Sequence, residues 1–256
     1  MNPQQRYSND VGKVALFVPN EALSMSVQQL AGVARQARMV GIDTLVVKFA
    51  DGTGKWYNSH QEVIDKYHAC TSQGVGMLPF TYCYGYGNGT KNNAQVDKEC
   101  AILLDLTQAI KEARGNNQEG FVMADLESEW NGQVGAAQRF VSNMNNQPGL
   151  LSITTWSDPN QQSWQSVART LVPVVNAWIP QAYNDWLYSQ LWQEKSLGEL
   201  NIQPAFDLSQ EFGPNHPLNG VLKARQNGLT TVYLWTLSLL TSQAATVREI
   251  VQVMHN

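Results

Sequence analysis

The sequence has little charge, no basic run and no long apolar run. Only 15% of its residues are charged, and the formal net charge is −4 at pH 7. Nucleic acid and anionic membrane surfaces are therefore not expected as main partners. No apolar stretch reaches the roughly 18 residues that a membrane span needs, so no membrane crossing is expected. Residues 1–10 also lack the apolar core of a signal peptide, which leaves a cytoplasmic location or export by a route that these residues do not encode.

Cysteine and histidine are too few and too scattered for a metal centre. The three cysteines, Cys70, Cys83 and Cys100, form no Cys-x-x-Cys pair, and the four histidines form no cluster. We therefore expect no metal and no cofactor, and we expect the histidines, on predicted helices or loops, to be solvated. The odd number of cysteines excludes a full disulfide framework, although one bridge, for example between Cys83 and Cys100, is compatible with the sequence.

Apolar runs bounded by turn residues alternate with stretches of helical periodicity along the chain. The predicted strands are residues 14–18, 44–50, 76–84, 121–127, 151–156, 177–183, 202–208 and 231–237. The predicted helices are residues 26–40, 59–72, 94–114, 133–144, 161–172, 187–197, 217–227 and 241–255, of which 161–172 is also compatible with a loop.

Eight strand–helix alternations over about 250 residues predict an α/β fold, a single (β/α)8 barrel of the TIM type. The barrel is expected to occupy residues 1–256 as one domain, with residues 1–12 as a polar N-terminal extension. A doubly wound open sheet is the alternative. That fold usually carries a glycine-rich phosphate turn after its first strand, and residues 18–21 read Val-Pro-Asn-Glu instead.

The segment from Gly120 to Trp130 joins an apolar strand to three carboxylates. Side chains two residues apart on a strand share a face and lie roughly 6.5–7 Å apart, so Asp125, Glu127 and Glu129 are predicted to lie together. An acidic end on an apolar strand is typical of a barrel strand just before its catalytic loop. The alternative is an acidic cap for the following helix. Because three acids on one face repel one another, we take them as the candidate catalytic residues.

Polar and aromatic residues also follow other predicted strands, at the end where a barrel carries its active site. Gln181 and Asp207 are notable because a polar group facing the covering helices would be costly, although the pattern does not determine which face is inward. Lys48 is either a partner of one acid or a surface lysine. Tyrosines and Trp235 at the mouth are compatible with simple packing. The predicted substrate-binding residues are Tyr82, Tyr84, Trp130, Trp156, Gln181, Tyr183, Asp207 and Trp235.

Paired carboxylates beside aromatic rings suit glycoside cleavage. The reaction needs a protonated acid at the leaving oxygen and a second group that stabilises the oxocarbenium-like centre. Crowding by Asp125 is expected to raise the pKa of Glu127 and keep it protonated. Acids on one strand are too close to form an opposed pair, so either Asp207 or the substrate's own acetamido group is expected to complete the site.

Four segments resemble the glycoside hydrolase family 25 lysozymes. They are residues 42–54 (second strand), 74–82 with 93–97 (third strand and its helix), 124–127 (Asp-x-Glu) and 178–184 (Trp-x-x-Gln-Tyr). The resemblance implies that Glu127 is the proton donor and that Asp125 positions an N-acetyl group. It also implies a β-1,4-linked N-acetylhexosamine polysaccharide as substrate. The chain departs from the family at residues 18–20, Val-Pro-Asn, where an acidic first strand is usual, and it has no Asp after its last strand.

A second register is similar to the family 18 chitinases. Residues 125–129 resemble their Asp-x-Asp-x-Glu motif, and residues 181–183 resemble Met-x-Tyr, although Val122 stands where a further Asp is usual. That register implies Glu129 as the acid, Glu127 as its helper and Tyr183 as support for the acetamido group. The expected function is thus a glycoside hydrolase-like activity. The alternatives are a degenerate barrel that binds carbohydrate without turnover, and a scaffold protein.

Overall fold

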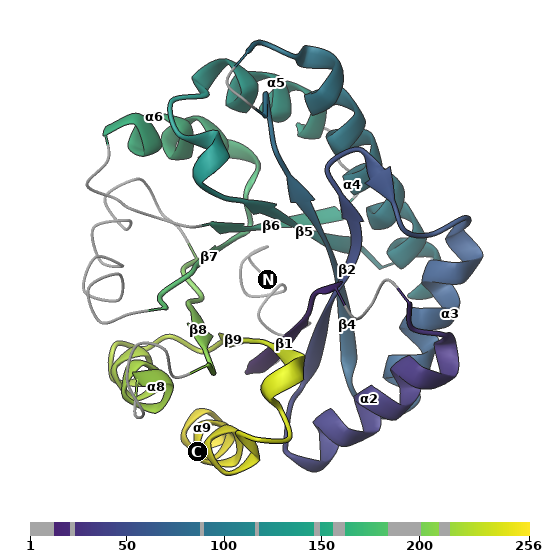
Figure 1. The fold of residues 1–256 in the computed structure, drawn as a ribbon, viewed down its shortest axis with the longest axis vertical. Helices are drawn as coiled ribbons and strands as arrows, with labels where there is room; N and C mark the ends of the chain where they lie inside the picture. Colours follow the sequence, from purple (N-terminus) through teal and green to yellow (C-terminus); the bar gives the residue numbers. More distant parts are fainter. Residues whose placement is uncertain are drawn as a thin grey trace.

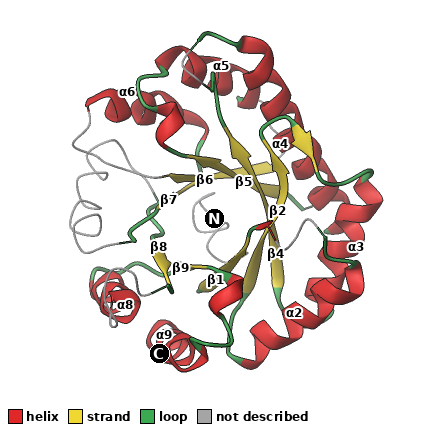
Figure 2. Cartoon of the chain, viewed as in Figure 1, coloured by secondary structure: helices red, strands yellow, loops and turns green. Residues whose placement is uncertain are grey.

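Eight parallel strands surround a common centre, and helices cover them from outside (Figures 1 and 2). The computed structural model describes residues 13–20, 24–87, 90–115, 118–145, 149–155, 162–183, 201–209 and 216–256. Within these residues the strands form a nearly closed barrel with seven helices, so the predicted α/β barrel of the TIM type is confirmed. The predicted extension at residues 1–12, the predicted helix at 187–197 and Trp156 lie outside the described residues.

The elements follow the predicted alternation with small shifts in their ends. The strands are β1 (Val14–Val18), β2 (Thr44–Asp51), β4 (Gly76–Cys83), β5 (Gly120–Leu126), β6 (Gly149–Thr155), β7 (Ala177–Pro180), β8 (Ala205–Asp207) and β9 (Val232–Trp235). A two-residue strand, β3 (Gly54–Lys55), pairs antiparallel with β2. The helices are α2 (Val27–Met39), α3 (His60–Thr71), α4 (Asn93–Ala113), α5 (Val134–Met144), α6 (Gln162–Leu171), α8 (His216–Gln226) and α9 (Ala244–His255).

The hydrogen-bonded strand order is β7-β6-β5-β4-β2-β1-β9-β8. Two isolated parallel bridges, Trp178 with Ile202 and Gln181 with Ala205, connect the β7 side to the β8 side. These bridges bring the two ends of the sheet together, which makes an open doubly wound sheet incompatible with the structure. All carboxyl ends of the parallel strands therefore meet at one mouth.

Aromatic contacts show which face of each strand is inside. The ring of Phe17 on β1 lies 5.4 Å from that of Phe80 on β4 and 5.9 Å from that of Tyr233 on β9, so these rings meet in the barrel interior. Outside, Trp178 of β7 packs against Trp164 of α6 with ring centroids 6.2 Å apart. Since Trp178 faces outward, alternation along β7 turns Ile179 and Gln181 inward.

Other findings concern the cysteines and the remaining expectations. Cys70, Cys83 and Cys100 are free and buried, so no bridge joins Cys83 to Cys100. None of the helices in the described part of the chain is long and apolar enough to cross a membrane. Residues 162–171 form a helix, which settles the choice left open between helix and loop.

Candidate active site

Asp125, on strand β5, and Glu127, just after this strand, lie at the barrel mouth. Asp125 is the last inward residue of the strand and is only 2% exposed, whereas Glu127 follows the strand in an extended conformation and is partly exposed. The side-chain amide of Gln181 donates to both, at 3.4 Å from Asp125 Oδ1 and 3.1 Å from Glu127 Oε1. The structure thus brings the two carboxylates and Gln181 to one place.

Glu129 reaches the same mouth from a different element. It lies on a short 3-10 helix, η2 (Ser128–Trp130), so it does not continue the strand that the sequence predicts through residue 127. The Tyr82 hydroxyl donates to Glu129 Oε2 at 3.0 Å, and Tyr82 pairs in register with Asp125 across β4 and β5. Burial and the charges of Glu127 and Glu129 raise the pKa of Tyr82, which keeps its hydroxyl a donor.

The pKa of the Asp125 carboxyl is raised well above its ordinary value. Burial is the first cause, the charge of Glu127 is the second, and the positive charge of Lys48 opposes them. The sequence predicts such an effect for Glu127. The structure shows it for Asp125, which lies inside the barrel wall.

A β-bulge on β2 adds Lys48 and Asp51 to the site. Lys48 pairs with Phe80, but Ala50 already pairs with Thr81, so Phe49 is the extra residue. Residues three apart on a regular strand face opposite sides, and the bulge instead turns both Lys48 and Asp51 inward. Lys48 Nζ lies 2.7 Å from Asp51 Oδ2. Of the two interpretations of Lys48, the structure supports the partner of an acid.

Glu99 of α4 holds the loop that follows β4, and sequence reasoning missed it. Its two carboxylate oxygens accept the backbone N–H groups of Tyr84 at 2.9 Å and Gly85 at 3.1 Å. Burial raises the pKa of Glu99, and these bonds together with one from Gln95 oppose the rise. A signal was available, because Glu99 interrupts the buried face formed by Val96, Cys100 and Leu103. The Tyr84 side chain is thereby aimed at Asp51, to whose Oδ1 it donates at 2.7 Å.

Tyr183 and Asp207 close the opposite side of the mouth. Burial raises the pKa of Tyr183, with further contributions from the charges of Asp125, Glu127 and Asp207. Asp207 ends β8, where it accepts hydrogen bonds from the backbone N–H of Ser209 at 2.8 Å and from the Ser209 hydroxyl. Both oxygens of Asp207 therefore already have donors within its own loop.

Of the tryptophans predicted to bind substrate, Trp130 and Trp235 lie in the described residues. Trp130 is fully buried, its indole N–H donates to Cys83 O at 2.6 Å, and its ring packs edge-on against Phe140 of α5. The prediction for Trp130 as a substrate-binding residue is wrong, because its ring lies in the core against Phe140 rather than at the mouth. Trp235 is partly buried against Phe17, with ring centroids 5.2 Å apart. Conversely, the half-buried Trp56, which sequence reasoning did not single out, lies at the mouth beside Lys48.

A second group of charges lies outside the barrel, and it corrects the expectation of a solvated side chain for His60, whereas His68 and His255 are exposed as expected. His60 bridges two acids of α4, with Nε2 2.9 Å from Asp105 and Nδ1 3.1 Å from Glu112. Asp105 also accepts from Lys55 Nζ at 2.7 Å and from the Tyr57 hydroxyl at 2.5 Å. We call these five residues the outer cluster.

The pKa shifts of the outer cluster reflect mutual stabilisation. Burial acts to raise the pKa of Asp105, but hydrogen bonds from Lys55, Tyr57 and His60 outweigh it and lower the pKa to about 2. The hydrogen bond to Asp105 raises the pKa of His60.

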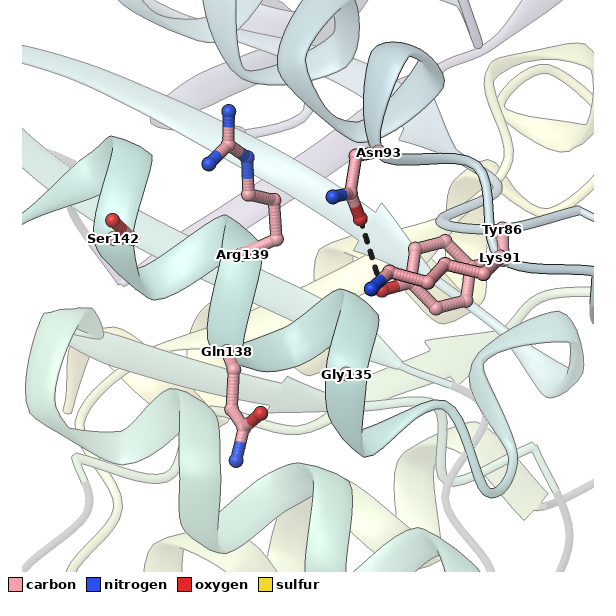
Figure 3. A pocket seen from close by; sticks show the side chains of 7 residues that line it. All are labelled: Tyr86, Lys91, Asn93, Gly135, Gln138, Arg139 and Ser142. Carbon is pink, nitrogen blue, oxygen red and sulfur yellow. Dashed lines mark hydrogen bonds between the residues drawn. The ribbon is translucent and has the colours of Figure 1, made fainter.

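A surface concavity of about 380 Å³ lies between the loop after β4 and helix α5 (Figure 3). Its lining residues are Tyr86, Lys91, Asn93, Gly135, Gln138, Arg139 and Ser142. The Tyr86 hydroxyl donates to Asn93 Oδ1 at 3.2 Å, whereas Gln138 and Arg139 point to different sides of α5. Because these side chains do not converge, the barrel mouth is the better candidate for chemistry. No group of His, Cys, Asp and Glu able to hold a metal ion occurs among the described residues.

Comparisons with known proteins show the fold. No protein-family model and no curated protein matches the chain. The spore cortex-lytic enzyme SleL of Bacillus cereus is similar in structure, with a TM-score of 0.62 and 11% identity over 93% of this chain and 74% of that one. Concanavalin B has a TM-score of 0.54 and 10% identity, covering 95% of this chain and 99% of its own. Tryptophan synthase from M. tuberculosis also has a TM-score of 0.54, with 11% identity over 97% and 94%. At such identities the likeness shows a shared barrel alone.

Proposed function

We propose that this barrel is a glycoside hydrolase that cleaves a β-1,4-linked N-acetylhexosamine polysaccharide of the peptidoglycan or chitin type. The observation that carries the proposal is the arrangement of Asp125 and Glu127 under one amide, Gln181, with a raised pKa at the buried member. Two carboxyl groups in different environments are what acid catalysis on a glycosidic bond requires. The similarity to SleL, whose name records a cortex-lytic enzyme, supports this class.

Glu127 is the proposed proton donor because it lies past the strand end, where a leaving oxygen has access to it. As the glycosidic C–O bond breaks, Glu127 gives its proton to the leaving oxygen. The resulting carboxylate then takes a proton from the water that attacks the anomeric carbon. Asp125 and Gln181 would hold the acetamido group beside that carbon.

The second group in the reaction is proposed to be the substrate's acetamido oxygen. Asp207 is the alternative nucleophile, but its oxygens accept hydrogen bonds from the backbone and hydroxyl of Ser209. Hydrogen bonds stabilise a carboxylate and lower its readiness to attack. Tyr183, whose pKa is raised in part by the charges of Asp125 and Glu127, is proposed to support an acetamido group instead.

The test is the release of reducing ends from peptidoglycan and from chitin oligomers. Glu127→Gln is expected to lower the rate by about 10²–10⁴-fold, because it removes the general acid. Glu129→Gln distinguishes the two registers, since a loss as large as that of Glu127→Gln would make Glu129 the acid. Glu112→Gln is the matched control, because Glu112 lies in the outer cluster. Equal rates for wild type and Glu127→Gln, or no release from either polymer, would reject the proposal.

A carbohydrate-binding barrel without turnover is the second candidate. It is favoured by the first strand, which ends in Val18 and Pro19 where the family 25 lysozymes carry an acid, and whose inner face carries Phe17. Isothermal titration with chito-oligosaccharides decides between the two. Binding without release of reducing ends supports this candidate, and absence of binding excludes it.

A further inference from the structure

Lys48 is a buried cation with a carboxylate and two aromatic rings close to its ammonium group. Its side chain is only 8% exposed, and burying an ammonium group is costly unless it is paired. Asp51 Oδ2 lies 2.7 Å from its Nζ, and the rings of Trp56 and Tyr82 lie with their centroids 5.0 Å and 5.5 Å away. A carboxylate and two aromatic faces are the kind of partners that a buried cation needs.

Two partners of Lys48, Asp51 and Tyr82, connect it to the acids at the mouth. We call these acids, Asp125, Glu127 and Glu129, the acid cluster. Asp51 is also bound by the Tyr84 hydroxyl at 2.7 Å, and the Tyr82 ring beneath Lys48 carries the hydroxyl that binds Glu129. The strand register places Asp51 opposite Tyr82 and Tyr82 opposite Asp125, so the three lie in one layer of the barrel. Removing Lys48 would therefore disturb both the charge of this layer and the position of its hydroxyl groups.

The pKa of Asp125 depends on titratable and charged groups from several elements around it. The titratable and charged groups around it are Lys48 and Asp51 on β2, Tyr82 and Cys83 on β4, Glu127 and Glu129 after β5, Tyr183 after β7, and Asp207 on β8 by way of Tyr183. Lys48 is the positive member of this set, and its effect on the pKa of Asp125 is opposite to that of Asp51.

We propose that Lys48 is a positioning residue whose charge, held in place by Asp51 and by the rings of Trp56 and Tyr82, governs the electrostatic environment of Asp125. Its part in hydrolysis rests on the proposed function, whereas its control of Asp125 can be measured without any substrate. The β-bulge at Phe49 is what makes this control possible, because a regular strand would separate Lys48 from Asp51.

The experiment titrates the carboxyl groups of the intact protein, labelled with ¹³C at Asp and Glu, by NMR. Asp125→Asn identifies the Asp125 signal by its disappearance. Lys48→Met removes the charge and keeps the length of the side chain, so the pKa of Asp125 is expected to rise by about one unit. Asp51→Asn removes the anion and leaves Lys48 unneutralised, so the pKa of Asp125 is expected to fall.

Opposite shifts are the signature that a purely structural role would not produce. If Lys48 only supports packing, Lys48→Met and Asp51→Asn would both lower stability and leave the Asp125 titration unshifted or shifted in one direction. Either result would overturn the proposal. Asp51→Asn keeps a side chain that can still accept from Lys48 and Tyr84, so the proposal stays testable if Lys48→Met does not fold.

Lys55→Met is the matched control. Lys55 also has a carboxylate 2.7 Å away, in Asp105, and an aromatic ring, that of Tyr57, 4.9 Å away, but it belongs to the outer cluster. The Lys55→Met variant is expected to leave the pKa of Asp125 unchanged.

If the polymers are hydrolysed, the whole pH–activity curve should move to higher pH in Lys48→Met and to lower pH in Asp51→Asn. Opposite titration shifts without hydrolysis by the wild type would retain the role of Lys48 and reject the proposed function.

Discussion

The inner cluster, formed by Lys48, Asp51, Asp125, Glu127 and Glu129 with their aromatic partners, and the outer cluster contain the same kinds of residues but differ in their balance of charge. Each contains a lysine that is 2.7 Å from an aspartate and lies over an aromatic ring, and each contains a tyrosine that donates to that aspartate. In the outer cluster Lys55 and His60 face Asp105 and Glu112, so positive and negative groups are matched when His60 is protonated.

The inner cluster is not matched. Lys48 there neutralises Asp51, while Asp125, Glu127 and Glu129 share the mouth. The consequence is visible in the aspartates, because the pKa of Asp105 is lowered to about 2 whereas the pKa of Asp125 is raised well above its ordinary value. Matched charges stabilise the fold, whereas a buried excess of acid costs stability and is typical of a functional site.

The largest expected effect is on the scaffold beneath the inner cluster. Trp130→Ala removes a fully buried ring and its hydrogen bond to Cys83 O, next to Glu129. We expect the free energy of unfolding to fall by about 3–5 kcal/mol, as for other large-to-small changes in a core. Urea denaturation followed by tryptophan fluorescence and circular dichroism measures it. A loss below about 1 kcal/mol would show that the inner cluster does not depend on this buried ring.

Asp125→Asn is expected to stabilise the protein at neutral pH. A carboxyl whose pKa is raised by folding contributes stability that is fully present below its unfolded pKa, near 3.8, and that is lost as pH rises through the folded pKa. The neutral side chain of Asn does not lose stability in this way as the pH rises. We expect a Tm about 2–4 °C above wild type at pH 8, which corresponds to about 1 kcal/mol, and a smaller difference at pH 4. A lower Tm at pH 8 would contradict the view that Asp125 is a buried excess charge.

Asp105→Asn should show the opposite sign. A carboxyl whose pKa is lowered contributes stability above its unfolded pKa, and this stability is lost as pH falls toward about 2. The carboxylate is 30% exposed, so solvent screens part of the effect, and we expect a Tm about 2 °C below wild type at pH 7. The deficit should shrink below pH 3. A deficit that grows on acidification would mean that the outer cluster is not held by charge.

His60→Gln is expected to have the smallest effect. The pKa of His60 is raised, so its contribution to stability is fully present below its unfolded pKa, near 6.5, and is lost as pH rises through the folded pKa. The ring is 32% exposed, which limits the effect to about 1 °C in Tm. Differential scanning calorimetry at pH 5.5 and pH 9 should show the larger deficit at pH 5.5. An equal deficit at both values would assign His60 a packing role.

Much of the barrel could be predicted from local pattern. The strand at 14–18 and the helices at 59–72 and 133–144 lie within one residue of the observed ends, because apolar periodicity and turn residues act within a few residues of the chain. The ends of β7 and β8 were less predictable. The sequence extends the apolar pattern into residues 181–183 and 202–204. In the structure, Gln181 and Ile202 in these stretches form isolated bridges rather than parts of a regular strand.

For the candidate site, alternation on one strand indicated that Asp125 and Glu127 share a face, and the shared bond to Gln181 shows that they meet. Sequence reasoning placed Trp130 at the mouth although alternation puts it on the face opposite the acids, and its ring is buried against Phe140. Sequence reasoning could not choose between the two interpretations of Lys48, and it overlooked Glu99, whose partners lie in a loop before α4.

The sequence by itself determined the rhythm of strands and helices and the concentration of acids after β5, since both depend on neighbours along one chain. The tertiary structure alone decided which acid is buried in the barrel wall, and which lysine is inside rather than outside. The charges that act on Asp125 include those of Lys48 and Asp51 on β2, and the bulge that turns these two residues together is defined by the pairing of β2 with β4. Such effects depend on distances between strands, which no single segment of the chain contains.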